Sequence, residues 1–166
     1  GATTISASGQ DITLDEAAST FGTLALTGSN VAVTENAAMD LGASTIGGTA
    51  NFNSTSNVIT DSGTLAITGA TTINAGTADI TLDQAASTFG ALALTGANVA
   101  VTENAATDLA ASTVSGTLGV TSTGVVTDSG TLAITGATTI SASGQDITLD
   151  EAASTFGTLA LTGSNV

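Results

Sequence analysis

The side chains of this chain with the clearest capacity for chemistry are its carboxylates. The 166 residues contain fourteen Asp and Glu but no His, Cys, Lys or Arg. One acidic residue recurs after each of a series of apolar anchors, forming a candidate acidic column of Asp15, Glu35, Asp61, Asp83, Glu103, Asp128 and Asp150. Carboxylates stacked at about 4.8 Å would repel by roughly 0.9 kcal/mol per pair in water. A hard cation such as Ca²⁺ between them would relieve that repulsion.

Two interpretations of the acidic column are open. In the first, these residues are solvated turn residues, some of which cap backbone N–H groups; in the second, they hold ordered Ca²⁺. No known calcium-loop motif is present, and the Gly-Gly-x-Gly-x-Asp nonapeptide of calcium-binding β-rolls is absent. The sequence therefore favours turn residues and predicts no cofactor and no metal-ligating residues, with Ca²⁺ at the acidic column as the alternative.

Catalysis is not expected. There is no His or Cys to act as base or nucleophile and no Lys or Arg to stabilise an oxyanion. Paired carboxylates can cleave polysaccharides, but a catalytic pair occupies one singular place, whereas these acids recur in every repeat. We therefore expect a non-enzymatic protein without catalytic or cofactor-binding residues.

The net charge of −14 also limits the partners. Without cations the chain cannot displace counterions from phosphate, so nucleic acid is not expected as a partner, and anionic lipid is disfavoured. No apolar run approaches the ~18 residues that a membrane span needs, so membrane insertion is not expected. The chain begins at Gly1 without a leader, so we expect any export signal to lie outside it.

The chain repeats itself at long period. Residues 1–31 are identical to residues 136–166, and residues 69–99 are a close variant. The copies therefore start at Gly1, Gly69 and Gly136. A fixed period, here about 67–68 residues, is the signature of a repeat architecture. We expect residues 1–166 to form a single continuous segment cut from a longer array, with super-repeats 1–68 and 69–135 and a partial repeat 136–166.

The super-repeat divides again by its apolar residues. Three apolar columns are aligned: Ile5, Leu26, Phe52, Ile73, Leu94, Val120, Ile140 and Leu161; Ile12, Val31, Val58, Ile80, Val99, Val125 and Ile147; and Phe21, Leu41, Ile67, Phe89, Leu109, Ile134 and Phe156. The alignment predicts roughly seven rungs of about 22 residues, three rungs to each super-repeat. Phe21, Phe89 and Phe156 are expected to fill the core.

Local patterns predict strands around these anchors. Segments such as Leu24-Ala25-Leu26 and Leu65-Ala66-Ile67 alternate in the way that a half-buried strand does. Gly, Ser, Asn and Asp fall between them, as turns require. The Ala-rich pieces 15–18 and 35–38 are too short to nucleate a helix and are predicted as corners. The expected fold is all-β: a right-handed parallel β-helix with three short strands per rung.

Two further features are expected to be structural. The first apolar column contains two long steps, from Leu26 to Phe52 and from Leu94 to Val120, which predict that Gly42–Thr49 and Ala110–Thr117 bulge from one corner. Such a bulge is a candidate binding face, although a spacer loop is favoured. A second polar column is expected to form hydrogen-bonded side-chain ladders: Asn30, Asn57, Asp79, Asn98 and Asp146.

The segments 58–68, 125–135 and 24–33 resemble the strand-turn-strand units of large secreted bacterial adhesins of the filamentous-haemagglutinin type. The resemblance covers the whole chain and implies a β-helical fibre that is exported and displayed outside the cell or on its surface. We therefore expect a non-catalytic structural shaft of a cell-surface adhesin or extracellular filament, which associates end to end with equivalent rungs. The alternatives are an adhesive repeat that binds a glycan, a protein or Ca²⁺ and, more remotely, an ice-binding solenoid.

Overall fold

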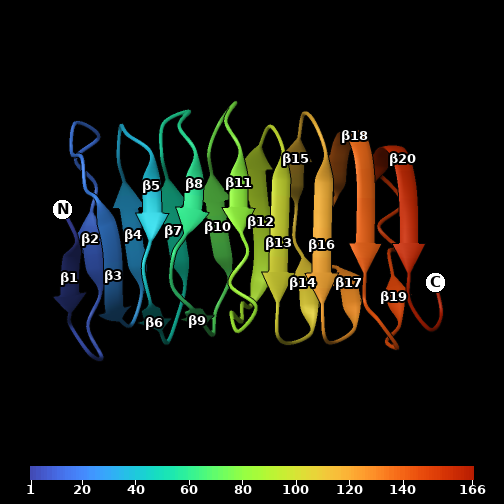
Figure 1. Cartoon of the computed structure of the whole chain (residues 1–166), viewed down its shortest axis with the longest axis horizontal. Helices are drawn as coiled ribbons and strands as arrows, with labels where there is room; N and C mark the ends of the chain where they lie inside the picture. The colour runs from blue at the N-terminus through green and yellow to red at the C-terminus, as the bar shows by residue number, and fades with distance from the viewer.

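Successive turns of the chain pair in parallel along the whole length of the molecule. The computed structural model describes residues 1–166 and contains twenty strands and no helix. The turns stack into an elongated β-solenoid of about 8 turns with ~20 residues per turn. The two termini lie at opposite ends of the long axis (Figure 1). The prediction of an all-β parallel solenoid is confirmed.

Two layers of strands carry most of the pairing. In Figure 1 one layer stands in front, with arrows pointing down, and the other lies behind it. The front layer contains, in order of pairing, β1 (Thr3–Ser6), β3 (Thr23–Gly28), β5 (Met39–Leu41), β8 (Ile59–Asp61), β11 (Ile80–Leu82), β13 (Val99–Glu103), β16 (Leu118–Ser122), the second half of β18 (Leu132–Ser141) and β20 (Thr155–Thr162). The back layer contains β2 (Ile12–Leu14), β4 (Val31–Thr34), β7 (Ala50–Asn53), β10 (Thr71–Asn74), β12 (Ala91–Gly96), β14 (Thr107–Leu109), β17 (Val126–Asp128) and β19 (Ile147–Thr148).

Short additional strands complete the ends of the layers. The last residues of β3 pair with β6 (Ser44–Ile46), which pairs with β9 (Leu65–Ile67). The last residues of β12 pair with β15 (Ser112–Val114), which pairs with the first half of β18. Figure 1 shows β6 and β9 at the lower edge and β15 at the upper edge. The chain therefore forms two or three strands per turn rather than a uniform three.

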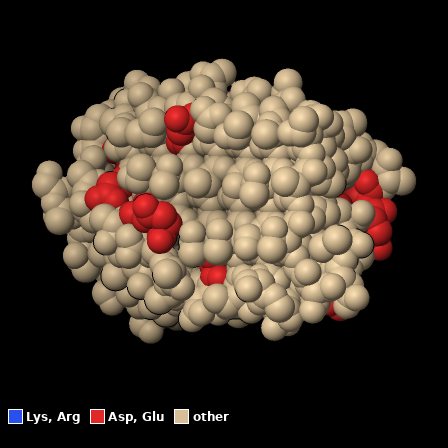
Figure 2. Space-filling model, turned by 45° about the vertical axis from the view of Figure 1, so that its right-hand side comes forward, with Lys and Arg blue, Asp and Glu red and all other residues tan.

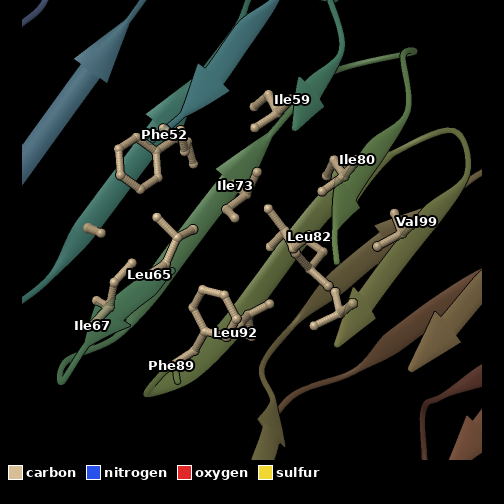
Figure 3. Packing of buried hydrophobic residues seen from close by; sticks show 14 of the residues in the cluster. Phe52, Ile59, Leu65, Ile67, Ile73, Ile80, Leu82, Phe89, Leu92 and Val99 are labelled. Carbon is tan, nitrogen blue, oxygen red and sulfur yellow. The ribbon is translucent and has the colours of Figure 1, made fainter. Parts of the chain in front are cut away.

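Alternation along each strand places one side chain in two between the layers. Thirty-two buried hydrophobic residues form one continuous cluster. Phe52, Ile73 and Leu92 point into the same narrow space from neighbouring back-layer strands, and Ile59 and Ile80 face them from the front layer (Figure 3). Because branched aliphatic side chains fill a narrow interior in well-defined rotamers, this composition suits a thin two-layer core. Phe89 is buried, and Phe21 and Phe156 pack partly buried against the cluster, as the sequence predicts.

The predicted apolar columns are only partly correct. Five of the seven steps in the first column are confirmed as register pairs, among them Phe52 with Ile73 and Ile140 with Leu161. The two long steps are wrong, because Phe52 lies over Val33 and Val120 lies over Val101. With ~20 residues per turn, the turns are shorter and more numerous than the seven rungs predicted.

The predicted bulges are therefore not bulges. Gly42–Thr49 contains strand β6, in which Ser44 and Ile46 are buried, and Ala110–Thr117 contains the equivalent strand β15. Each is a paired part of the solenoid wall. These segments looked like loops because each holds a single large apolar residue between glycines or small polar residues. Neither segment protrudes as the predicted loop.

A similar correction applies to the second column. Val58 and Val125 were predicted as buried anchors, yet each is 41% exposed. Their neighbours Ile59 and Val126 point inward instead and are fully buried. Because side chains alternate between the two faces of a strand, an error of one residue exchanges the buried and exposed faces. In the same column Val31 pairs with Ala50 rather than lying beneath Val58.

The 68-residue repeat corresponds to about three and a half turns. Val31 pairs with Ala50, Ala50 with Thr71 and Thr71 with Leu92, which makes three turns within the back layer. The fourth turn ends at Leu109. Val99, the equivalent of Val31 in the next repeat, lies between Leu92 and Leu109 along the chain, in front-layer strand β13. The predicted three rungs per super-repeat are therefore wrong by half a turn.

This half turn makes equivalent strands alternate between the two layers. β4 and β7 lie in the back layer, whereas their equivalents β13 and β16 lie in the front layer. β5 and β8 lie in the front, and their equivalents β14 and β17 lie behind. Copies separated by two repeats return to the same layer, as β2 and β19 do. Successive repeats therefore show the same residues on opposite faces of the solenoid.

One corner of each repeat is built from glycines in close contact. The Gly69 N–H donates to the Gly48 carbonyl oxygen at 2.9 Å, and the Gly136 N–H donates to the Gly116 carbonyl oxygen at 2.8 Å. A Cβ on Gly69 would lie 2.5 Å from the Gly48 carbonyl oxygen, closer than real Cβ contacts allow. Most glycines therefore allow two turns to approach closely. Positive φ is the reason that the sequence suggests for glycines in turns, and it occurs at Gly9, Gly76 and Gly144.

Candidate functional site

The most unusual groups in the interior are two glutamates in equivalent positions of successive repeats. Glu35 follows β4 and Glu103 ends β13, and both side chains are 0% exposed. The carboxylate Oε1 of Glu35 accepts the Phe21 N–H at 2.6 Å, and Oε1 of Glu103 accepts the Phe89 N–H at 2.8 Å. Oε2 of each glutamate is buried without a hydrogen-bond partner. Each glutamate therefore fixes the start of the Phe-containing segment while one of its oxygens stays unsatisfied.

Two aspartates form a second buried pair of equivalent positions. Asp61 ends β8 and Asp128 ends β17, and both are buried. Oδ1 of Asp61 accepts the Asp83 N–H at 2.8 Å, and Oδ1 of Asp128 accepts the Asp150 N–H at 2.8 Å. Both bonds join neighbouring turns. These aspartates therefore cap backbone donors, as predicted, but the prediction that they are solvated is wrong, because both are buried.

The seven predicted acidic positions do not form one column. Glu103 pairs in register with Ser122 rather than with an acidic residue, and Asp61 pairs with Leu41. Only Asp61 with Asp83 and Asp128 with Asp150 meet on neighbouring turns, and in both pairs the contact is a carboxylate with a backbone N–H. No group of three or more acidic side chains comes together. The continuous carboxylate ladder that motivated a calcium site is thus not formed.

Burial raises the pKa of three carboxyl groups. At Glu35 the Phe21 N–H opposes the rise in part, and at Glu103 the Phe89 N–H and the Thr107 hydroxyl do so. Burial likewise raises the pKa of Asp61, with a further increase from the Asp83 carboxylate, against the lowering effect of backbone N–H groups. Desolvation disfavours a charged carboxylate, and this chain has no basic side chain to offset it.

The predicted polar column forms short side-chain ladders. Oδ1 of Asp11 accepts the Nδ2–H of Asn30 at 2.9 Å, and Oδ1 of Asn30 accepts the backbone N–H of Thr49 at 2.9 Å. The next repeat copies this arrangement with Asp79, Asn98 and Thr117, and Asp146 accepts from Asn165. The structural role is confirmed for these positions. Asn57 is the exception, because its Nδ2 donates to the carbonyl of Ser54 within its own turn.

Sequence reasoning missed four serines that hold neighbouring turns together. The hydroxyl of Ser44 accepts the Leu26 N–H at 2.9 Å and donates to the Gly42 carbonyl at 2.8 Å. Ser112 makes the equivalent contacts in the next repeat. Ser87 and Ser154 accept the N–H groups of Leu65 and Leu132, each at 3.0 Å. Their recurrence at the repeat spacing was the available signal, but in a Ser-rich chain it does not stand out.

The surface offers no concave site. No pocket is present, and on the face shown in Figure 2 the acidic side chains form separate groups on mostly uncharged surface. The structure contains no helix with the length and hydrophobicity of a membrane span. Paired turns, inter-turn caps and polar ladders define a β-solenoid repeat protein whose recognisable side-chain interactions mostly join one turn to the next.

Comparison with known families identifies the chain as a repeat protein. It belongs to the family of repeats of unknown function (DUF5649), whose model matches residues 1–27, 28–95 and 96–163. The second and third matches each have the length of one repeat, the separation of Gly1 from its copy Gly69. No curated protein and no solved structure matches the chain. The family match supports a structural repeat protein and carries no statement about adhesion.

Proposed function

We propose that this solenoid is a non-catalytic structural shaft, part of a longer array that is displayed at the bacterial cell surface as the stalk of an adhesin or as an extracellular filament. The observation that carries the proposal is the unbroken parallel pairing from β1 to β20 around one continuous core. A stack in which every turn rests on its neighbours extends in one dimension as repeats are added. Such a stack gives length and stiffness for little sequence complexity.

The composition supports this role. The backbone makes 101 backbone–backbone hydrogen bonds, so the fold is held by main-chain ladders and burial without a single basic side chain. A net charge of −14 with no positive side chain discourages sideways aggregation of long rods. The lack of Lys and Arg removes the sites at which trypsin-like proteases cleave, and the lack of Cys prevents mispaired disulfides during export.

The burial of the interior turns supports the proposal of end-to-end stacking. Ile73 and Leu94 are covered almost completely by a turn on each side. Exposed strand edges accept further strands. We therefore expect further turns of the same kind, from the same array or from another copy, to continue the stack.

Labelling on intact cells tests the shaft. Arrays with increasing numbers of the 68-residue repeat are expressed in their native context, and an epitope beyond the last repeat is located by immunogold electron microscopy. Because three and a half turns at about 4.8 Å each rise ~17 Å, the gold should move outward in proportion to the number of repeats added. Gold that stays at one distance, or intact cells that do not label, would contradict the proposal.

A metal requirement can be tested on the purified chain. Since the acidic residues are not stacked in one column, we propose that the solenoid folds without Ca²⁺. Thermal unfolding followed by circular dichroism should give the same midpoint in EDTA, in Mg²⁺ and in Ca²⁺ at matched ionic strength. A midpoint that rises in Ca²⁺ alone would restore the calcium alternative.

A further inference from the structure

Four carboxyl groups lie inside a molecule that has no basic side chain to pair with them. Glu35 and Glu103 are 0% exposed, and Asp61 and Asp128 are buried at the end of their strands. Oε2 of both glutamates and Oδ2 of Asp61 have no hydrogen-bond partner. No pocket adjoins them that could hold a counterion. In Glu35, Glu103 and Asp61 the backbone N–H bond to one oxygen offsets only part of the cost of burying a charge, because the other oxygen has no partner.

The neighbouring elements supply only further acids. Glu35 lies between β7, which has no titratable residue, and the turn that carries Asp15 and Glu16. Glu103 lies between β16, which also has no titratable residue, and the turn that carries Asp83. The titratable side chains beside both glutamates are therefore acids, which cannot stabilise a negative charge.

Asp61 has the same kind of surroundings. It is packed between β5, which carries Asp40, and the segment after β11 that carries Asp83. The only charged groups near it are therefore carboxylates as well.

We propose that folded solenoid turns bind protons at Glu35, Asp61 and Glu103, so that acidification stabilises the folded stack and a rise in pH destabilises it. At Glu103 the Thr107 hydroxyl lies close to the carboxyl group and partly offsets the effect of burial, because it can donate to the ionised form. Burial still dominates there, and Oε2 and the Thr107 hydroxyl oxygen are both buried without a hydrogen-bond partner. At Glu35 and Asp61 the proton removes a buried charge.

The direction of the effect follows from linkage. The pKa of each of these three groups is raised in the folded state, chiefly by burial. The folded state therefore binds these protons more tightly than the unfolded state does. Their contribution to stability is fully present below the ordinary carboxyl pKa and is lost as the pH rises through the raised values. Stability should increase from neutral pH down to about pH 4.

The composition removes the usual opposing effect. Most proteins accumulate positive charge in acid, because carboxylates are neutralised while Lys, Arg and His stay protonated. This chain has none of those residues, so acid takes its net charge from −14 towards zero. Acid therefore also relieves repulsion among the exposed carboxylates. This second effect has no link to burial, and a control has to separate the two.

A matched pair of double variants provides that control. Glu35→Gln with Glu103→Gln removes the two buried glutamates, and Asp150→Asn with Glu151→Gln removes two exposed acids beside Asp128, with the same change in charge. Thermal midpoints are measured between pH 7 and pH 3.5. The wild-type midpoint should rise by about 5 °C or more on acidification. The exposed variant should retain most of that rise, and the buried variant should lose a clearly larger part of it.

Proton counting gives a readout that does not depend on any variant folding. Calorimetric unfolding of the wild-type chain at pH 5.5, in buffers of different ionisation enthalpy, measures the protons exchanged. We expect unfolding to release protons, because the pKa of each of these three groups is raised in the folded state. Proton uptake or no exchange on unfolding would overturn the proposal, as would equal loss of the pH dependence in the two double variants. The inference holds for the solenoid whether or not it serves as a surface shaft.

Discussion

Deleting Gly42–Thr49 is expected to abolish cooperative folding of the solenoid. The deletion removes β6, and with it the buried Ser44 and Ile46 and the pairing that joins β3 to β9. Truncating one buried Ile to Ala costs about 2–5 kcal/mol, and here a paired strand is lost as well. Circular dichroism melts and limited proteolysis should show a broad, early transition and rapid cleavage near β9.

The control for this deletion is a change that the array itself contains. The turn Ser54–Val58 is one residue longer than its counterpart Ser122–Val125. Deleting Ser56 together with Asn57→Gly converts the first turn into one like the second and removes a residue with φ of 70°. The melting midpoint of this variant should stay close to that of the wild type. A Gly42–Thr49 deletion that melts like the wild type would show that the segment is a dispensable loop.

Gly69→Ala should destabilise the molecule by about 3 kcal/mol or more, at the upper end of the cost of overpacking. The new Cβ would lie 2.5 Å from the Gly48 carbonyl oxygen and 2.6 Å from its carbonyl carbon, and backbone atoms cannot rotate away as a side chain can. The turns at that corner must separate, which weakens the Gly69 N–H bond to Gly48. For a chain of this size the melting midpoint should fall by roughly 6–12 °C.

Gly47→Ala is the matched substitution, since a Cβ at Gly47 meets nothing within 4 Å and its φ is not positive. It introduces the same methyl group one turn away from Gly69. Its midpoint should lie within about 2 °C of the wild type. Equal effects from the two substitutions would mean that the close glycine contact does not constrain the stack.

The sequence predicts the fold class because its strongest signals are local and repeated. Alternation in segments such as Leu24-Ala25-Leu26 predicts strands, and the regular return of the same stretch at Gly1, Gly69 and Gly136 predicts stacked turns. The side-chain ladder through Asn30 and Asn98 could also be predicted, because an amide before an apolar anchor recurs at the repeat spacing. These features depend on residues that recur in every repeat, so one repeat is enough to reveal them.

The register of the turns could not be predicted, because inward positions do not always hold a large apolar side chain. Ala50 and Thr71 point inward in the back layer, and Ser44 does so in β6. An alignment of large apolar residues passes over these positions and joins Leu26 to Phe52 instead of to β6. The buried state of Glu35 was equally hidden, since the sequence around it reads as an ordinary solvent-facing turn.

The half turn left over by each repeat has a consequence for how such an array can change in evolution. Loss or duplication of a single 68-residue unit would rotate everything beyond it by about half a circle, so that a distal module would face the opposite way. Gain or loss of two units would leave its facing unchanged. The identical stretches 1–31 and 136–166 are separated by two units, which together make about seven whole turns. Recombination between them would shorten the rod while preserving the direction in which its far end points, so even numbers of units should be exchanged more freely than odd ones.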